Sequence, residues 1–148
     1  MKRIVGLIVV LIISWNACEQ EQPKNVRLEF RFAETESAEG LTGMTAQISD
    51  EKIFLHDEVV ISNADIDSAF ASAGQFGPQV ELIFTAAGSA KYAKLTEDNI
   101  NKRIGMLIDG KLISAPSIRT KIPDGRAIIW GKWTKEEAEI IARGIIAK

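Results

Sequence analysis

The sequence contains a single cysteine and a single histidine, and these two scarcities exclude several kinds of protein. One cysteine forms no disulfide within the chain and no cysteine-based zinc cluster, and one histidine makes no multi-histidine metal site. The sequence also has no large excess of charge of one sign, because 18 basic and 20 acidic residues leave a net charge of −2. Non-specific nucleic-acid binding needs a basic surface, so we expect no nucleic-acid partner. The longest apolar run is also shorter than the roughly 20 residues of a membrane-spanning helix.

What the sequence does contain begins with a short apolar leader. Lys2 and Arg3 precede ten residues without a polar side chain, 4–13, and charged residues resume at Glu19. A basic start, an apolar centre and a small residue before the break are typical of a secretory signal, which we predict over 1–17. Removal of that segment, with Lys2 and Arg3, would leave 131 residues with a net charge of −4. This length suits one domain.

The only cysteine, Cys18, follows Ala17 at the end of the leader. Its position resembles the processing site of a bacterial lipoprotein, in which the cysteine becomes the lipidated first residue of the mature chain. Trp15 departs from that pattern, which has an aliphatic residue at its place. We predict lipid attachment at Cys18 and a polar tether over 18–25. An ordinary cleaved signal and an uncleaved anchor are the alternatives.

Short apolar segments between turn residues predict an α+β domain over residues 26–148. Residues 26–32 alternate apolar and charged side chains, which predicts a strand with one buried face. The other expected strands lie within 44–48, 52–61, 80–84, 103–108, 111–114 and 126–130, and the expected helices lie over about 66–70, over 86–95 and after 134. We expect a two-layer sandwich of a mainly antiparallel sheet with helices on one face.

Two local motifs give the strongest structural signals. Asp109-Gly110 lies between two apolar runs, and this dipeptide supplies the positive φ angles of a tight hairpin turn. Thr134 is followed three residues later by Glu137, which is the spacing of a capping box at the start of a helix. The sequence therefore predicts a β-hairpin around 109–110 and a last helix after Thr134.

The C-terminal half also carries an ordered pair of longer motifs. Residues 106–116 read MLIDGKLISAP and residues 131–138 read GKWTKEEA, about 15 residues apart. Together they resemble the head subdomain of the first periplasmic region of SecD, a membrane component of bacterial protein export. The resemblance is strongest over 80–138 and extends over about 26–148. It implies a domain that contacts unfolded or partner polypeptides. It does not imply the proton-linked motor, which belongs to the transmembrane helices of SecD.

No residue pattern predicts a catalytic residue, a metal site or a cofactor, and we expect no enzyme. His56 has the acidic neighbours Asp57 and Glu58, and Asp65 and Asp67 lie close together. Such residues occur more often at turns and at helix starts than in acid–base sites.

Three aromatic residues are candidates for contact with a partner. Trp130 and Trp133 follow the last predicted strand, and Phe76 lies in a glycine-rich turn. Aromatic side chains are frequent anchors of protein interfaces. Packing within the domain is the alternative interpretation for each of them.

These observations favour a non-enzymatic lipoprotein of the bacterial cell envelope, held to a membrane by its lipid and facing the periplasm or the surface. Its single domain would serve as a binding or accessory module for exported or envelope polypeptides. An ancillary component or regulator of Sec-dependent protein export is the alternative. A small hydrolase is a more distant one, and it would require a pocket with a cluster of perturbed titratable groups.

Overall fold

The computed structural model describes residues 24–147. The predicted signal peptide, the candidate lipid-attachment residue Cys18 and most of the predicted tether lie outside these residues. None of the helices within 24–147 combines the length and the apolar character that membrane crossing requires.

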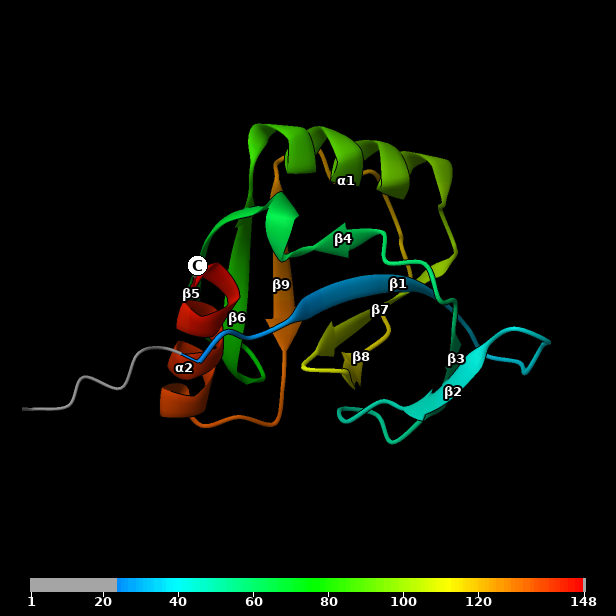
Figure 1. Cartoon of the computed structure of the whole chain (residues 1–148), viewed down its shortest axis with the longest axis horizontal. Helices are drawn as coiled ribbons and strands as arrows, with labels where there is room; N and C mark the ends of the chain where they lie inside the picture. The colour runs from blue at the N-terminus through cyan, green and yellow to red at the C-terminus, as the bar shows by residue number, and fades with distance from the viewer. Residues whose placement is uncertain (1–23, 148) are drawn as a thin grey trace, which may run out of the picture.

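Six strands form the first sheet, which occupies the centre and lower right of the view in Figure 1. They are β1 (Leu28–Glu34), β2 (Thr42–Thr45), β3 (Lys52–Leu55), β4 (Ile61–Ser62), β7 (Arg103–Ile108) and β8 (Lys111–Ser114). The central strand β1 pairs with β7 along its length, and on its other side pairs first with β4 and then with β3. The predicted hairpin is confirmed as β7–β8, with positive φ angles at Asp109 and Gly110.

Three strands form the second sheet, in the order β5–β6–β9. They are β5 (Ile66–Gly74), β6 (Gly77–Phe84) and β9 (Arg126–Trp130). The described strands all pair antiparallel, which confirms the predicted strand orientation and the α+β class. The predicted layer of strands is divided into two separate sheets.

Two helices and one short 3-10 turn complete the described chain. The turn η1 (Asn63–Asp65) precedes β5, α1 (Ala86–Asp98) follows β6, and α2 (Lys135–Ile146) ends the domain. The Thr85 hydroxyl caps α1, and the predicted capping box between Thr134 and Glu137 is confirmed at the start of α2. In Figure 1, α1 lies above both sheets, whereas α2 packs against β5 and β6.

The main apolar core lies between the two sheets and the two helices. Its largest fully buried members are Leu28 and Phe30 from β1, Ile61, Leu82, Ile104 and Ile129. A smaller core lies under the other end of the first sheet and consists of Ala33, Ala46, Ile53, Leu55, Leu107, Leu112 and Ala115. Burial of these side chains from water is the principal stabilising contribution to both parts.

The predicted helix over residues 66–70 is wrong, because this segment is the first half of strand β5. Ser62 and Asp65, just before this segment, form a capping box, but the box starts only the three-residue turn η1. Pairing with β6 then holds the following residues extended. Tertiary contacts thus override a local helix signal here.

One side of α1 is buried against the rest of the domain. It is formed by Gly88, Tyr92 and Thr96, whereas Ala86 and Ala90 are exposed. Gly88 is required there, because a Cβ at this position would lie 2.3 Å from the carbonyl oxygen of Asp65. The absence of a side chain at Gly88 therefore allows α1 to pack closely against η1.

Candidate functional site

The second sheet has one face in the core and one face toward solvent, and the solvent face carries large apolar side chains. Strand register places Phe70, Glu81 and Ile128 in one row across this face, and Ser72, Gln79 and Trp130 in the next. We name four residues the aromatic patch, with exposed fractions in parentheses: Phe70 (44%), Phe76 (75%), Ile128 (42%) and Trp130 (44%). Clustered apolar exposure of this kind marks interaction surfaces more often than scattered exposure does.

A chain of hydrogen bonds fixes the tryptophan of the patch. The Trp130 Nε1–H donates to Gln79 Oε1 at 2.6 Å, and Gln79 Nε2 donates to Ser72 Oγ at 3.0 Å. Gln79 Nε2 also lies 3.3 Å from Glu81 Oε1, to which the Ser72 hydroxyl donates. These contacts hold the indole ring in one orientation, so a ligand does not have to immobilise it.

Phe76 reaches the same patch from the tip of the β5–β6 hairpin. Its ring meets the Trp130 ring edge-on, with the centroids 5.6 Å apart and an angle of 77° between the planes. The turn that presents Phe76 depends on Gly77, whose φ is +118°. The structure therefore brings together two of the three aromatic residues predicted from the sequence.

Trp133 lies elsewhere. It is partly buried and packs against the main core. Its ring also covers Gly131, where a Cβ would lie within 2.4 Å of three ring atoms. Trp133 borders a separate hollow with Ile113 and Ile140 and does not belong to the aromatic patch.

A groove of about 480 Å³ runs beside the outer edge of β9. Its lining consists of side chains from β6, α1, β7, β9 and the segment 116–124: Glu81, Tyr92, Ile104, Met106, Pro116, Ser117, Ile118, Arg119, Thr120, Ile122, Asp124, Arg126, Ala127, Ile128 and Trp130. A smaller hollow of about 230 Å³ shares Pro116, Ile128 and Trp130 with it and also borders Ile48. We call this pair of hollows the β9 groove.

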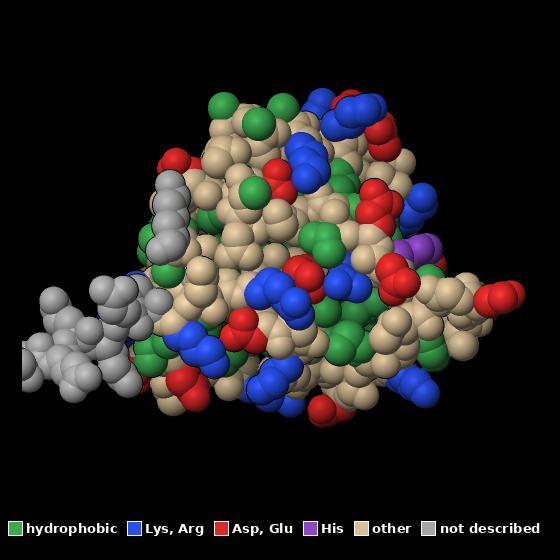
Figure 2. All heavy atoms as spheres, in the orientation of Figure 1, with side chains coloured by type: hydrophobic (Ala, Val, Ile, Leu, Met, Phe, Trp, Pro, Cys, Tyr) green, Lys and Arg blue, Asp and Glu red, His purple; other side chains and the backbone are tan. Residues whose placement is uncertain are grey.

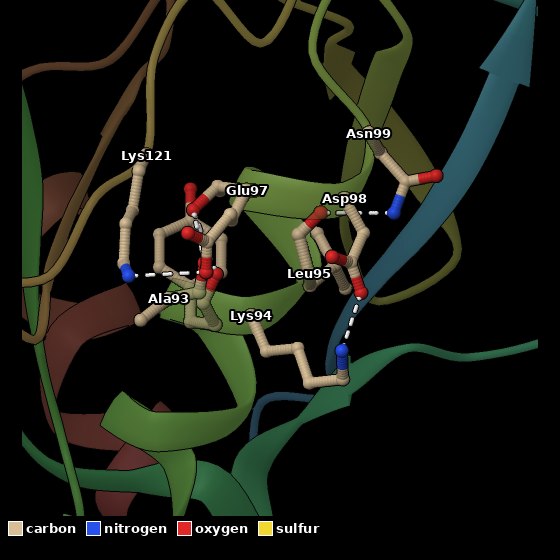
Figure 3. Close-up of polar contacts among 9 residues, drawn as sticks. Ala93, Lys94, Leu95, Glu97, Asp98, Asn99 and Lys121 are labelled. Carbon is tan, nitrogen blue, oxygen red and sulfur yellow. Dashed lines mark hydrogen bonds and ion pairs between the residues drawn. The ribbon is translucent and has the colours of Figure 1, made fainter.

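The wall of the groove opposite β9 is fixed to the rest of the domain. Ile118 exchanges backbone hydrogen bonds with residues 101–102, and the Ile122 N–H donates to Thr96 Oγ1 at 2.9 Å. Lys121 reaches Glu97 of α1 at 3.0 Å (Figure 3). The groove is therefore already formed in the free chain.

Tyr92 of α1 lines this groove and titrates abnormally. Burial, followed by the negative charge of Asp124, raises the pKa of its phenol to about 12. Its ring stacks on Phe84 with the centroids 4.8 Å apart. The groove thus surrounds the phenol with an environment that disfavours charge.

Two of the titratable residues considered from the sequence, His56 and Asp65, have polar partners in the structure. His56 Nε2 lies 3.1 Å from Glu34 Oε1 on the surface. Asp65 accepts from the backbone N–H of Ser62 and pairs with Lys91. Within residues 24–147, no group of three or more His, Cys, Asp or Glu side chains is arranged to hold a metal ion.

Two further ion pairs account for the remaining shifts in pKa. A hydrogen bond from Arg103 lowers the pKa of Glu51, and the same bond raises the pKa of Arg103. A hydrogen bond with Asp98 raises the pKa of Lys94 at the end of α1 (Figure 3). On the face seen in Figure 2, basic and acidic side chains are interspersed rather than gathered by sign.

Comparison with known proteins gives consistent results. The family model described as SecDF, P1 head subdomain, matches residues 20–146. The chain is 38% identical over 134 residues to the protein translocase subunit SecDF of Thermus thermophilus, covering 78% of this chain and 18% of that protein. It is 39% identical over 92 residues to SecD of Elusimicrobium minutum, covering 60% and 19%. The chain thus spans about a fifth of the length of these relatives.

Solved structures agree with the sequence comparison. A crystal structure of SecDF in a super-membrane-facing form matches with a TM-score of 0.68 and 30% identity, over 84% of this chain and 19% of that chain. A structure of SecDF, described as a membrane component that enhances protein export, matches with a TM-score of 0.67 and 29% identity, over 84% and 64%.

Proposed function

The chain belongs to the SecDF P1 head subdomain family, and from this premise we propose that it is a non-enzymatic module that binds polypeptides of the bacterial cell envelope. The observation that carries the proposal is the preorganised pair of Phe76 and Trp130 on an exposed sheet face. Aromatic side chains that are held in place and surrounded by apolar neighbours act as anchors for protein partners. The chain's relatives SecDF and SecD are protein translocase subunits, which supports a polypeptide as the ligand.

A binding measurement with an unfolded chain tests this function. We expect the full chain to bind a reduced and alkylated protein, which cannot fold, and to ignore the same protein in its native disulfide-bonded form. Phe76→Ala combined with Trp130→Ala should weaken binding roughly tenfold, because both anchors are lost. Ile140→Ala, an exposed isoleucine on α2 outside the patch, is the matched control. Equal affinity for folded and unfolded probes would contradict the proposal.

We further propose that Cys18 carries a lipid that holds the domain at a membrane. The basic, apolar and small-residue sequence of the leader supports this, although Trp15 departs from the usual lipoprotein pattern. Mass spectrometry of the mature N-terminus tests it. A diacylated Cys18 is the expected product, and an unmodified cysteine at that position would exclude the anchor.

An ancillary role in Sec-dependent export is a second candidate, favoured by family membership. On this hypothesis, deletion of the gene slows export of secreted proteins, and the wild-type chain restores it. A Cys18→Ser chain, which cannot be lipidated, would fail to restore export. Normal export kinetics after deletion would leave the general binding role and remove the export role.

A further inference from the structure

The outer edge of β9 exposes backbone groups that no described strand uses. Phe84 N–H donates to the Gly125 carbonyl at 2.9 Å, and in the same register Leu82 opposes Ala127 and Val80 opposes Ile129. In an antiparallel ladder, hydrogen-bonded pairs alternate with pairs whose backbone groups point away from each other. These pairs are therefore the bonded ones, and β6 leaves the backbone of the intervening β9 residues free.

Arg126, Ile128 and Trp130 are the β9 residues with this outward backbone, and Ile128 lies at the centre of the strand. β6 is the one strand that pairs with β9 in the described chain. Among residues 24–147, the turn and loop segments also make no backbone hydrogen bond to Ile128 or Trp130. Exposed strand edges are commonly protected by charged side chains, proline or a covering element. The centre of β9 has none of these, whereas the other edge strand, β5, packs against α2.

The β9 groove lies along this edge and provides space for another strand. A strand added beside β9 would point alternate side chains toward the groove floor, where Tyr92, Ile104 and Met106 lie. Its other side chains would continue the solvent face beside Ile128 and Trp130. The floor thus accepts apolar side chains at every second position of an added strand.

The charge of the groove is balanced and indicates the kind of segment that fits. Its lining contains three arginines, Arg103, Arg119 and Arg126, and three acidic residues, Glu51, Glu81 and Asp124. The Glu81 carboxylate is already hydrogen-bonded within the second sheet. Charge complementarity therefore favours an uncharged segment with alternating apolar side chains over an acidic or a basic one.

We propose that the free edge of β9 binds an extended, uncharged segment of an unfolded polypeptide as an additional strand of the second sheet. The proposal rests on the proposed polypeptide-binding function and specifies how the ligand is held. Backbone hydrogen bonds from Ile128 and Trp130 provide affinity for many sequences, and the apolar floor selects alternating side chains.

Backbone methylation of a defined ligand tests this binding mode with the wild-type chain. The probe is an eight-residue peptide in which valine and threonine alternate, measured by fluorescence anisotropy against the full chain in detergent. Two derivatives carry N-methyl groups on alternate amides, in the two possible registers. One set of amides faces β9 and the other faces away from it. We expect one derivative to bind at least about tenfold more weakly, and the other to bind within about twofold of the parent.

A pair of proline variants locates the contact. Ile128→Pro removes an outward N–H at the free edge without removing a bond to β6. It should weaken the parent peptide about tenfold more than Ile128→Ala, which removes the same patch side chain but keeps the N–H. Ala73→Pro is the matched control on β5. The backbone groups of Phe70 and Ser72 are the ones that bond to β6, so the Ala73 N–H points away from β6. Circular dichroism verifies that each variant is folded, and the methylated peptides test the mode without any variant.

The outcomes separate this inference from the proposed function. Equal affinities of the two methylated peptides would overturn strand addition, and if Phe76→Ala then weakened both, polypeptide binding by the aromatic patch would stand. Failure of every peptide and of the unfolded protein probe to bind would overturn both proposals. A concentration-dependent dimer in sedimentation that Ile128→Pro abolishes would assign the edge to a second copy of the chain and overturn the polypeptide ligand.

Discussion

Tyr92 offers a measurement in which a single ionising group reports on the packing of the domain. It is the only tyrosine in the chain and is 4% exposed. Its ring stacks on Phe84 and meets Phe30 edge-on, with centroid separations of 4.8 and 6.2 Å. Burial and the charge of Asp124 raise its pKa from the ordinary value of 10 to about 12. We predict that ionisation of this phenol destabilises the folded chain at high pH.

The sign and size of the effect follow from linkage between ionisation and folding. Because the folded state has the higher pKa, the contribution of the neutral Tyr92 phenol to stability is intact below pH 10 and is lost as the pH rises through 12. A shift of about two pKa units corresponds to about 2.7 kcal/mol in total. Of this, about 1.4 kcal/mol should be lost by pH 11 and about 2.3 kcal/mol by pH 12.

Comparison with Tyr92→Phe isolates this effect from all other alkaline titrations. The variant keeps the aromatic ring and lacks the ionising hydroxyl, so lysine and arginine contributions cancel between the two chains. Urea unfolding at pH 9, 11 and 12 should show the wild type losing stability relative to the variant by the amounts above. A constant difference across these pH values would refute the reasoning. Tyrosinate absorbance with a midpoint near pH 10 in a chain still folded by circular dichroism would refute it as well.

Three further substitutions test the packing and polar contacts that organise the fold. Gly88→Ala should destabilise the folded chain by about 1–3 kcal/mol in urea unfolding, because the new methyl group collides with the Asp65 carbonyl. An unchanged unfolding midpoint would disprove that contact. Asn63→Ala removes three side-chain hydrogen bonds and should lower the free energy of unfolding by about 2–3 kcal/mol. A decrease of less than about 0.5 kcal/mol, which is the usual effect of a surface substitution, would contradict this prediction. Glu51→Gln should abolish the stabilising ion pair with Arg103 at neutral pH. Because the pKa of Glu51 is lowered, the wild type should lose this advantage as the pH falls below the ordinary glutamate value, and a pH-independent difference would argue against the pair.

Local chemistry made part of this fold predictable from the sequence. The β7–β8 hairpin depends on Asp109-Gly110, and α2 begins at the capping box of Thr134 and Glu137. In both cases the residues that decide the structure are adjacent or within one helical turn. The signal is therefore present in any short window of the chain.

Contacts between distant segments account for what the sequence could not predict. Asn63 accepts from the Leu28 N–H and donates to the Val26 and Ile145 carbonyls, so it joins three parts of the chain that no local pattern relates. The same holds for residues 66–70, whose strand conformation depends on β6. Because the sequence predicts a helix over the first half of β5, it also could not predict that Ser72, Gln79 and Trp130 lie side by side on the solvent face of the second sheet.

The two proposed ligand contacts both involve strand β9, which offers side chains on the solvent face of the sheet and backbone groups at its free edge. Side chains of Ile128 and Trp130 contribute to the aromatic patch, whereas their backbone groups form the free edge beside the groove. A polypeptide strand added at that edge would place its own solvent-facing side chains next to the Trp130 ring, which Gln79 already holds. Side-chain and backbone binding would then reinforce each other, yet they remain separable. Phe76→Ala removes only an apolar contact, and N-methylation of the peptide removes only a backbone hydrogen bond, so their effects on the affinity of one peptide should be close to additive.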